Sequence, residues 1–462
     1  MKGNLKRVLV FFMLMGVVNY FLIFKTDLSR EAILSLDVFF LAVFLWSTEI
    51  IHPTLTALLI FCLLPIFKIL PLEDTFMVMG NPIIWRLLGI FVMTKGMEAT
   101  GLAQRIALRI LNMAKGNLYY LLLMMELITF IFVFLVPAAA ARTAILASVC
   151  LGLVQKLDNG RDRNFSKAAS IIIAVTSMVT SNTIIVGASA TIYAIGYLEK
   201  NLHYKVTYLS WLQSNLPPNL LALIVIYVVI VKLFPFNGKM KGKDEIFKGE
   251  LQGLGPMSPA QWKMVIYLGL LLSAWLIGLD YSLPVEFMAG TLLFLPGIGV
   301  LDRKESFKAL DWESIILFGS GLAMAESLNK TGGINYLVQN LGGLSGLNEI
   351  TAIIGIVLIT VVVRLGMANM TGVVATLLPV FTSLSFALGF NPVWACTVCI
   401  MASSLGILVP SQSMSMLTTY SYGYYTSKDM FKTGILVILG YGLIIMATSH
   451  FYWPYLGLHA LP

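Results

Sequence analysis

Apolar runs of about 20 residues recur along almost the whole 462-residue chain, and each is long enough to cross a bilayer as a helix. In lipid every backbone amide must find its partner within the chain, so only helices and closed barrels can span it. Hydrophobic residues make up 58% of the chain and charged residues only 12%, against roughly 25% charged in average soluble domains. The sequence therefore predicts an all-α polytopic membrane protein.

We expect about 11 transmembrane helices, at 7–25, 32–51, 54–70, 82–97, 168–198, 211–235, 260–280, 284–301, 312–328, 393–424 and 430–453. Two further apolar regions, 118–155 and 349–390, are broken in the middle. Each is either a pair of spans or a re-entrant hairpin, which enters and leaves by one face. With the N-terminus cytoplasmic, this count puts every strongly basic loop inside and the C-terminus outside. Cytoplasmic loops thus explain the net charge of +8 better than a nucleic-acid partner does.

A weak internal repeat runs through the chain. "LPIFKILPLEDTF" (64–76) matches "LPGIGVLDRKESF" (295–307) at an offset of 231 residues. Each unit contains five crossings, so the second copy is predicted to be inverted, as in many secondary transporters. The predicted order is an N-terminal helix, two inverted repeats and a cytoplasmic linker between them. Their bounds are 1–29 for the helix, 30–235 for the first repeat with hairpin 118–155, 236–259 for the linker, and 260–462 for the second repeat with hairpin 349–390.

The centres of the two hairpins are aligned by the same offset. "AAAART" (138–143) pairs with "NMTGVV" (369–374), and two later spans are interrupted by "TSNTIIVGASAT" (180–191) and "LGILVPSQSMSML" (405–417). Helix packing through small residues is the alternative for any single stretch. Non-helical backbone at membrane depth survives only inside protein or beside a cavity, and it aims positive helix N-termini at a common point. An anionic ligand suits that geometry.

At these residues the chain resembles the divalent-anion:sodium symporters, which carry dicarboxylates, citrate and sulfate. The resemblance is strongest in "SIILFGSGLAMAESLNKTG" (314–332), "ANMTGVVATLLPV" (368–380) and "YSYGYYTSKDMFKTG" (420–434). It implies a homodimer in the cytoplasmic membrane, with a fixed scaffold part and a moving transport part. It also implies two re-entrant hairpins that meet at the substrate, and no cofactor apart from sodium as a possible coupling ion.

Hairpin tips in that family usually carry Ser-Asn-Thr. Here the second tip keeps Asn369 and Thr371, whereas the first has Ala138–Ala140 at the place of the triplet, and Arg142 and Thr143 follow after one more alanine. Arg142 has two interpretations: a cation that offers a bidentate fork to a carboxylate, or a structural partner of a buried acid such as Glu126. Sodium sites, if present, are expected near Ala138–Ala140 and Asn369–Thr371. The candidate substrate-binding residues are Ala138, Ala139, Ala140, Arg142, Thr143, Ser181, Asn182, Thr183, Gly187, Asn369, Thr371, Ser413 and Ser415.

We predict a secondary transporter, a symporter or an exchanger, that moves a small di- or tricarboxylate by alternating access. Sulfate, a sulfonate or another small organic anion is the alternative substrate. An intramembrane enzyme is disfavoured, because the chain has no HExxH or nucleophile-elbow motif. It also has no P-loop, so we do not expect transport to be driven directly by ATP. A channel is a further class that flux measurements would separate from a carrier. The sequence leaves open whether sodium, protons or counter-substrate drives transport.

Overall fold

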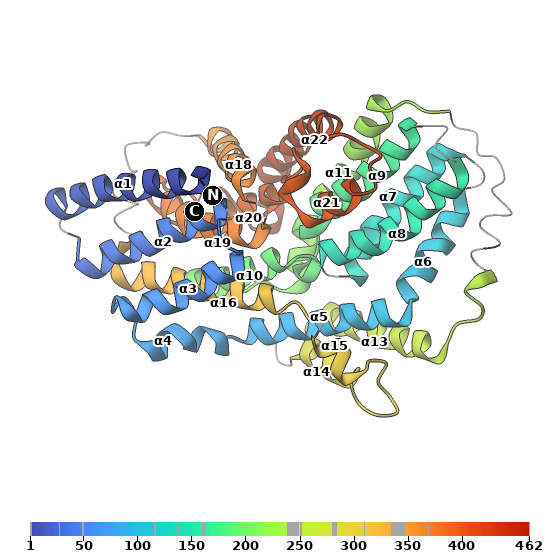
Figure 1. Ribbon diagram of the computed structural model, residues 1–462, viewed down its shortest axis with the longest axis horizontal. Helices are drawn as coiled ribbons and strands as arrows, with labels where there is room; N and C mark the ends of the chain where they lie inside the picture. The colour runs from blue at the N-terminus through green and yellow to red at the C-terminus, as the bar shows by residue number, and fades with distance from the viewer. Residues whose placement is uncertain are drawn as a thin grey trace.

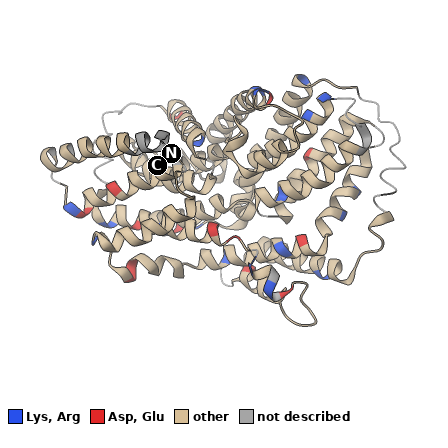
Figure 2. Cartoon of the chain, in the orientation of Figure 1, with Lys and Arg blue, Asp and Glu red and all other residues tan. Residues whose placement is uncertain are grey.

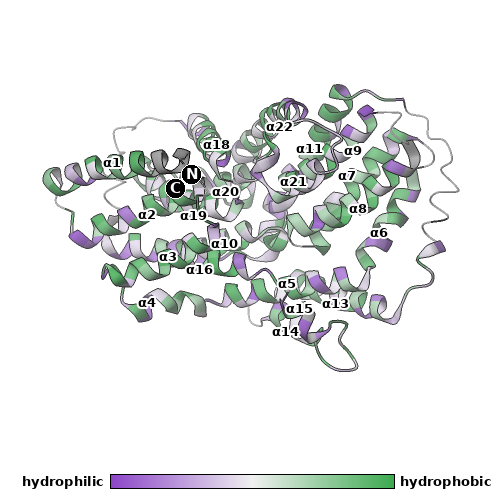
Figure 3. Cartoon of the chain, in the orientation of Figure 1, coloured by the Kyte–Doolittle hydropathy of each residue, from purple (hydrophilic) through white to green (hydrophobic). Residues whose placement is uncertain are grey.

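The computed structural model describes residues 2–461 except 27, 49, 115–116, 137, 159–162, 238–248, 250–251, 280–283, 309, 334–347 and 368. Every regular element in this described part is a helix, as the sequence predicts (Figure 1). Hydrophobic residues make up most of the helices, and charged residues lie mainly towards helix ends and in loops (Figures 2 and 3). Most of the predicted linker at 236–259 lies outside the described residues.

Five described helices are long and apolar enough to cross a membrane, or six if a bent pair at 72–100 counts as one span. The five are Leu118–Leu135, Tyr208–Leu233, Glu349–Gly366, Met370–Leu388 and Ser427–Leu456. Three of them lie in the regions predicted as hairpins, so their length alone also allows a pair of spans there. The larger number of about 11 spans stays a prediction.

Two groups of helices flank a central region (Figure 1). One group contains the N-terminal helices and packs α3 against α16 and α5 against α14. Its members include α1 (Lys2–Lys25), α2 (Arg30–Thr48), α3 (Pro53–Ile66), α4 (Leu72–Met77), α5 (Pro82–Thr100), α14 (Val285–Leu292) and α16 (Trp312–Thr331). The other group includes α7 (Leu118–Leu135), α8 (Ala139–Asp158), α9 (Arg163–Val179), α11 (Tyr208–Leu233), α21 (Met414–Tyr420) and α22 (Ser427–Ala447).

The 231-residue offset reappears in the backbone of the two broken regions. α7 ends at Leu135 and α8 begins at Ala139, while α18 (Glu349–Gly366) ends and α19 (Met370–Leu388) begins 231 positions later. Val136 and Met367 follow the first helix of each pair, with φ/ψ of −130°/97° and −127°/113°. Both residues are extended, so the two chains leave their helices in the same way. The offset is therefore a structural repeat at this point.

The two interrupted spans also match, but at an offset of 225 residues. A short 3₁₀ turn, Ile185–Gly187, precedes an extended Ala188 and then α10 (Ser189–Leu202). The turn Pro410–Gln412 likewise precedes an extended Ser413 and then α21. Pro410 is well placed at the start of its turn, because its missing N–H would have no intrahelical acceptor there.

The two pairs of interrupted helices are interleaved rather than separate. α21, from the C-terminal half, packs on α8 and α9. α10, from the N-terminal half, packs on α19 and on α20 (Pro392–Ser403), the helix that precedes the second break. Each half therefore donates one helix to the other, and the four breaks are brought together at the centre of the molecule.

Candidate functional site

A cavity of about 540 Å³ lies where the two hairpin tips meet the two interrupted spans. Seven of the thirteen candidate residues line it, and they come from three of the four breaks: Ala138, Ala139, Ala140, Asn369, Thr371, Ser413 and Ser415. The first interrupted span lines it through Val186, Ala188, Ser189 and Ala190 instead. Residues separated by more than 270 positions are thus gathered at one place, as the repeat predicted.

The four helices that follow the breaks begin at this cavity. The first residues of α8, α10, α19 and α21 all line it: Ala139, Ser189, Met370 and Met414. A helix N-terminus carries roughly half a positive charge, from amides that lack intrahelical acceptors. The wall is therefore electropositive through its backbone. The alanines of the first tip also suit this arrangement, because a methyl group keeps the amides close to the cavity surface.

The tip side chains have specific local contacts. Asn369 caps α19, with its Oδ1 accepting hydrogen bonds from the amides of Thr371 at 2.8 Å and Gly372 at 3.3 Å. The Asn369 Nδ2 group is then the part of the amide available to a ligand. The Thr371 and Ser189 hydroxyls lie 2.9 Å apart, so a hydrogen bond joins the starts of α19 and α10. Ser413 caps α21 by accepting from the amide of Met416 at 3.2 Å.

The first turn of α10 is different, because no side chain caps it. Its preceding residue, Ala188, has no polar side-chain atom, and both Ala188 and Ser189 line the cavity. The first amides of a helix need an acceptor from outside the helix. An anion in the cavity would provide one at this point.

Among the described lining residues, titratable side chains are found only at the rim of the cavity. His52, Asp311 and Glu313 are the lining residues that can carry a charge, and neither lysine nor arginine is among them. The side chains of His52 and Glu313 retain 56% and 63% of their exposure, so the cavity reaches the surface beside them. The described lining residues therefore contribute positive potential to the inner wall through their backbone and not through cationic side chains of their own.

Arg142 lies behind this wall. It is fully buried, and its guanidinium donates to Ser177 O at 2.7 Å, Val136 O at 2.9 Å and Ser177 Oγ at 3.1 Å. It therefore ties the extended residue of the first tip to α9. These partners are two carbonyls and a hydroxyl, not the Glu126 carboxylate of the second interpretation. They also occupy the fork that the first interpretation offered to a substrate.

The other five candidate residues are buried and do not line the cavity: Thr143 on α8, and Ser181, Asn182, Thr183 and Gly187 in the first interrupted span. Asn182, for example, accepts hydrogen bonds from Trp211 Nε1 and Asn219 Nδ2 on α11. A Cβ at Gly187 would lie 2.2 Å from the Ser181 carbonyl oxygen, so only glycine fits there. The hydrogen bonds of Asn182 and the close fit at Gly187 fix the shape of the first interrupted span.

Sequence reasoning missed a second buried arginine. Arg364 Nη1 donates to Met367 O at 2.9 Å, the extended residue that corresponds to Val136. Gln412 Nε2 donates to the Arg364 carbonyl at 3.0 Å, and Gly406 lies so close that a Cβ would meet the guanidinium. Each tip is therefore tied to its neighbouring break by an arginine. Arg364 comes before its tip and Arg142 after, so the offset could not pair them.

The rim residues were also missed, as were Ser189 and Ser411 of the lining. The two serines stand inside the quoted interrupted stretches, so their position was a usable signal. The rim residues sit on α3 and α16, which no local pattern connects to the tips.

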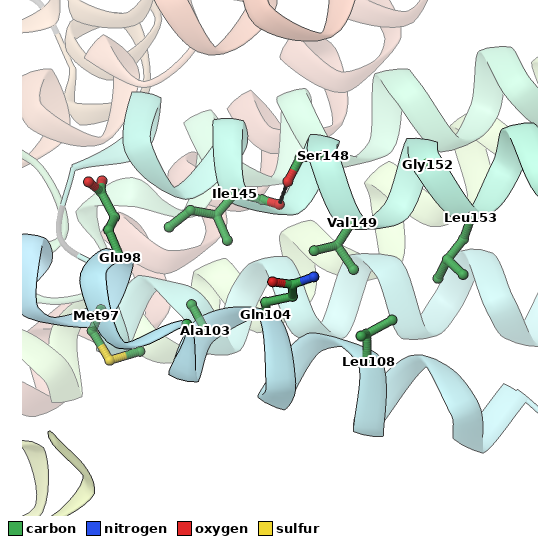
Figure 4. Close-up of a pocket in the computed structure, with 11 residues that line it drawn as sticks. Met97, Glu98, Ala103, Gln104, Leu108, Ile145, Ser148, Val149, Gly152 and Leu153 are labelled. Atoms are coloured by element: carbon green, nitrogen blue, oxygen red, sulfur yellow. Dashed lines mark hydrogen bonds between the residues drawn. The ribbon is translucent and has the colours of Figure 1, made fainter. Parts of the chain in front are cut away.

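A second cavity, of about 390 Å³, lies between α6 (Leu102–Leu111) and α8 (Figure 4). One face of α8 lines it with Ile145, Ser148 and Val149, opposite Gln104 and Leu108. None of the candidate residues lines this second cavity. Of the described helices, only the short α6 begins beside it, so helix N-termini do not converge there as they do at the tips. The cavity at the tips is therefore the candidate site.

An all-helical membrane fold whose interrupted helices meet at a central cavity is the architecture of a secondary transporter. The chain belongs to the family described as "Sodium:sulfate symporter transmembrane region", which matches residues 3–459. This confirms the resemblance to the divalent-anion:sodium symporters. The protein is a transporter and not an enzyme.

Curated relatives cover most of the chain at low identity. A "Sodium-dependent dicarboxylate transporter SdcS" of Staphylococcus saprophyticus is 24% identical over 466 residues, covering 94% of this chain and 88% of its own length. A "Membrane protein" of Cupriavidus necator is 26% identical over 372 residues, covering 78% of this chain and 72% of its own.

Two solved transporters share the fold. MtrF of Neisseria gonorrhoeae, described among antimetabolite efflux pumps, aligns with a TM-score of 0.55 at 15% identity and covers 83% of this chain and 84% of its own. The YdaH transporter of Alcanivorax borkumensis aligns with a TM-score of 0.56 at 12% identity, covering 92% and 99%. At these identities the likeness concerns the fold alone.

Proposed function

We propose that this protein is a sodium-coupled secondary transporter that moves a small dicarboxylate across the cytoplasmic membrane by alternating access. The observation that carries the proposal is the convergence of helix N-termini on a cavity with no lysine or arginine in its described lining. α8, α10 and α19 contribute about half a positive charge each, or about 1.5 charges together. That potential suits a small dianion, and the hydroxyl groups around it suit carboxylate oxygens.

The names of the relatives support both the substrate and the ion. Curated relatives are called sodium-dependent dicarboxylate transporters. Sodium would bind carbonyl oxygens near Ala138–Ala140 and Asn369–Thr371, as predicted from the sequence. Because Arg142 directs its donors to groups behind the wall, its charge is partly satisfied there. A cation at the first tip is therefore less disfavoured than it would be if the guanidinium pointed into the cavity.

Alternating access requires that the cavity close on one side while it opens on the other, and two helices favour this mechanism. α10 and α16 both begin at the cavity and both end at a cluster of charges. There Lys200 pairs with Glu326 at 2.6 Å, and Lys330 pairs with Asp74 at 2.9 Å and with Glu326 at 3.3 Å. The rim is open at the opposite ends of these helices. We infer that the charge cluster closes the far side in this state.

The predicted topology is compatible with the contacts between loops. Lys167 pairs with Asp429 at 3.0 Å, and both were placed in the cytoplasm. His450 pairs with Glu349 at 2.9 Å. With a cytoplasmic N-terminus, the predicted count of spans places both residues outside, on the same side as the charge cluster at Lys330. We therefore propose that the N-terminus is cytoplasmic, the C-terminus external and the open rim cytoplasmic. The homodimer implied by the family and the re-entrant hairpins belong to the same proposal.

The experiment is uptake of labelled succinate into proteoliposomes with an inward sodium gradient. We expect saturable uptake that collapses when sodium is replaced by potassium, together with a rise in melting temperature on adding succinate and sodium, by mass action. Labelled sulfate in the same vesicles tests the alternative substrate. Succinate flux that does not saturate and shows no counterflow would indicate a channel. Absence of both succinate uptake and thermal stabilisation would overturn the proposal.

A further inference from the structure

The rim of an anion cavity here carries acidic side chains. Glu313 lines the cavity at the start of α16, and its carboxylate lies 3.9 Å from the His52 imidazole across the rim. Asp311, also in the lining, is held in place as the N-cap of α16. It accepts from Ser314 N at 3.0 Å and from Ser314 Oγ at 2.6 Å. An anion must therefore pass two carboxylates to reach the tips.

The inner wall cannot offset much additional negative charge. The described lining contains no lysine or arginine, and the N-termini of α8, α10 and α19 together supply about 1.5 positive charges. Two carboxylates of a substrate use this potential. A third carboxylate would lie between the tips and the rim, where the lining carries the carboxylates of Asp311 and Glu313.

We propose that Glu313 and Asp311 determine the charge of the substrate, so that the cavity takes dicarboxylate dianions and disfavours tricarboxylate trianions. This inference rests on the proposed function and names the groups that restrict its substrate to dicarboxylates. Selection is by repulsion, which is how many specific sites reject a competitor that differs by one group. Glu313 is the residue to change, because Asp311 also caps a helix.

The size of the effect follows from Coulomb's law. At a separation of about 8 Å and the dielectric constant of water, reversing one charge changes the preference for one extra substrate charge about fivefold. Salt at about 0.1 M reduces this to about twofold, because the Debye length is about 10 Å. The effect is therefore modest, but it has a defined sign and a defined salt dependence.

The test compares succinate with tricarballylate, which adds a third carboxylate and no hydroxyl, as competitors of labelled succinate in proteoliposomes at fixed sodium and pH 8. The readout is the ratio of the two inhibition constants. In Glu313→Lys we expect the ratio to move two- to fivefold towards tricarballylate, with Glu313→Gln in between. Glu73→Lys on α4, an exposed site outside the cavity lining, makes the same charge change and is expected to leave the ratio unchanged.

Salt gives a second, independent readout on the unsubstituted protein. Its preference for succinate should weaken as an inert potassium salt rises from 0.02 M to 0.3 M, and Glu313→Gln should flatten that dependence. An unchanged ratio in Glu313→Lys, with succinate still transported, would overturn charge selection at the rim. Failure of the unsubstituted protein to bind or transport succinate would overturn the proposed function instead.

Discussion

Replacement of Arg142 tests whether a buried cation beside the cavity is a ligand or a structural tie. The structure assigns it three close hydrogen bonds, to Ser177 O, Val136 O and Ser177 Oγ, at 2.7 to 3.1 Å. Leaving a buried polar group without its partner costs about 1–3 kcal/mol. With the three acceptors, Arg142→Ala is expected to destabilise the fold by about 3–9 kcal/mol. Arg142→Lys should be intermediate, because an ammonium cannot reproduce the fork.

The assay is thermal unfolding of purified protein in detergent, with and without succinate and sodium. We expect the melting temperature to fall on the order of 5–10 °C in Arg142→Ala, given the small shift per kcal/mol in a chain of this size. Arg109→Ala, an exposed arginine on α6, is the matched control and should melt as the unsubstituted protein does. Succinate should still raise the melting temperature of Arg142→Lys.

One result would refute this reasoning. If Arg142→Ala melts normally but is no longer stabilised by succinate, the guanidinium contacts the substrate. The hydrogen bonds to Ser177 and Val136 would then not describe its role.

Three further outcomes follow from the described contacts. Asn369→Ala should weaken succinate binding roughly tenfold, as expected for losing a hydrogen bond to a charged ligand, whereas Asn369→Asp should keep the α19 cap and melting temperature but lose binding; equal affinity in Asn369→Ala would remove its amide from the site. Gly187→Ala should lower the melting temperature without succinate, because its Cβ would meet the Ser181 carbonyl at 2.2 Å; normal melting would show that the break can relax. Lys200→Glu should reduce uptake by destabilising the closed charge cluster, and adding Glu326→Lys should restore part of it; no rescue in the double variant would dissociate this pair from transport.

The sequence predicted the positions of the hairpin breaks well, because a repeat records backbone geometry that both copies must keep. Val136 and Met367 share their extended conformation at the predicted offset. The same offset gave no account of the second pair of breaks, which the structure aligns at Ala188 and Ser413 with six fewer residues between them. A deletion between two matching elements leaves each intact and hides the correspondence.

Side-chain direction was the part that the sequence could not supply. "SNT" at 181–183 has the composition of a ligand motif, yet its side chains point into packing against α11 and the break itself. Arg142 follows the tip directly, but the position of Ser177 on α9 decides that it faces away from the cavity. Glu313 became relevant only when α16 packed beside α10. Each depends on a neighbour distant in sequence, which no local pattern records.

The exchange of helices between the halves has a consequence for how the protein is made. α10 is synthesised long before α19 and α20, the helices on which it packs. The polar break before α10 therefore lacks these packing partners until the C-terminal half has been made. α21 in turn completes the surroundings of α8 and α9 only near the end of synthesis. Contacts this distant in sequence form slowly and leave folding intermediates exposed. Biogenesis is therefore finished by the C-terminal half, and an N-terminal fragment would lack the helix that packs on α8 and α9.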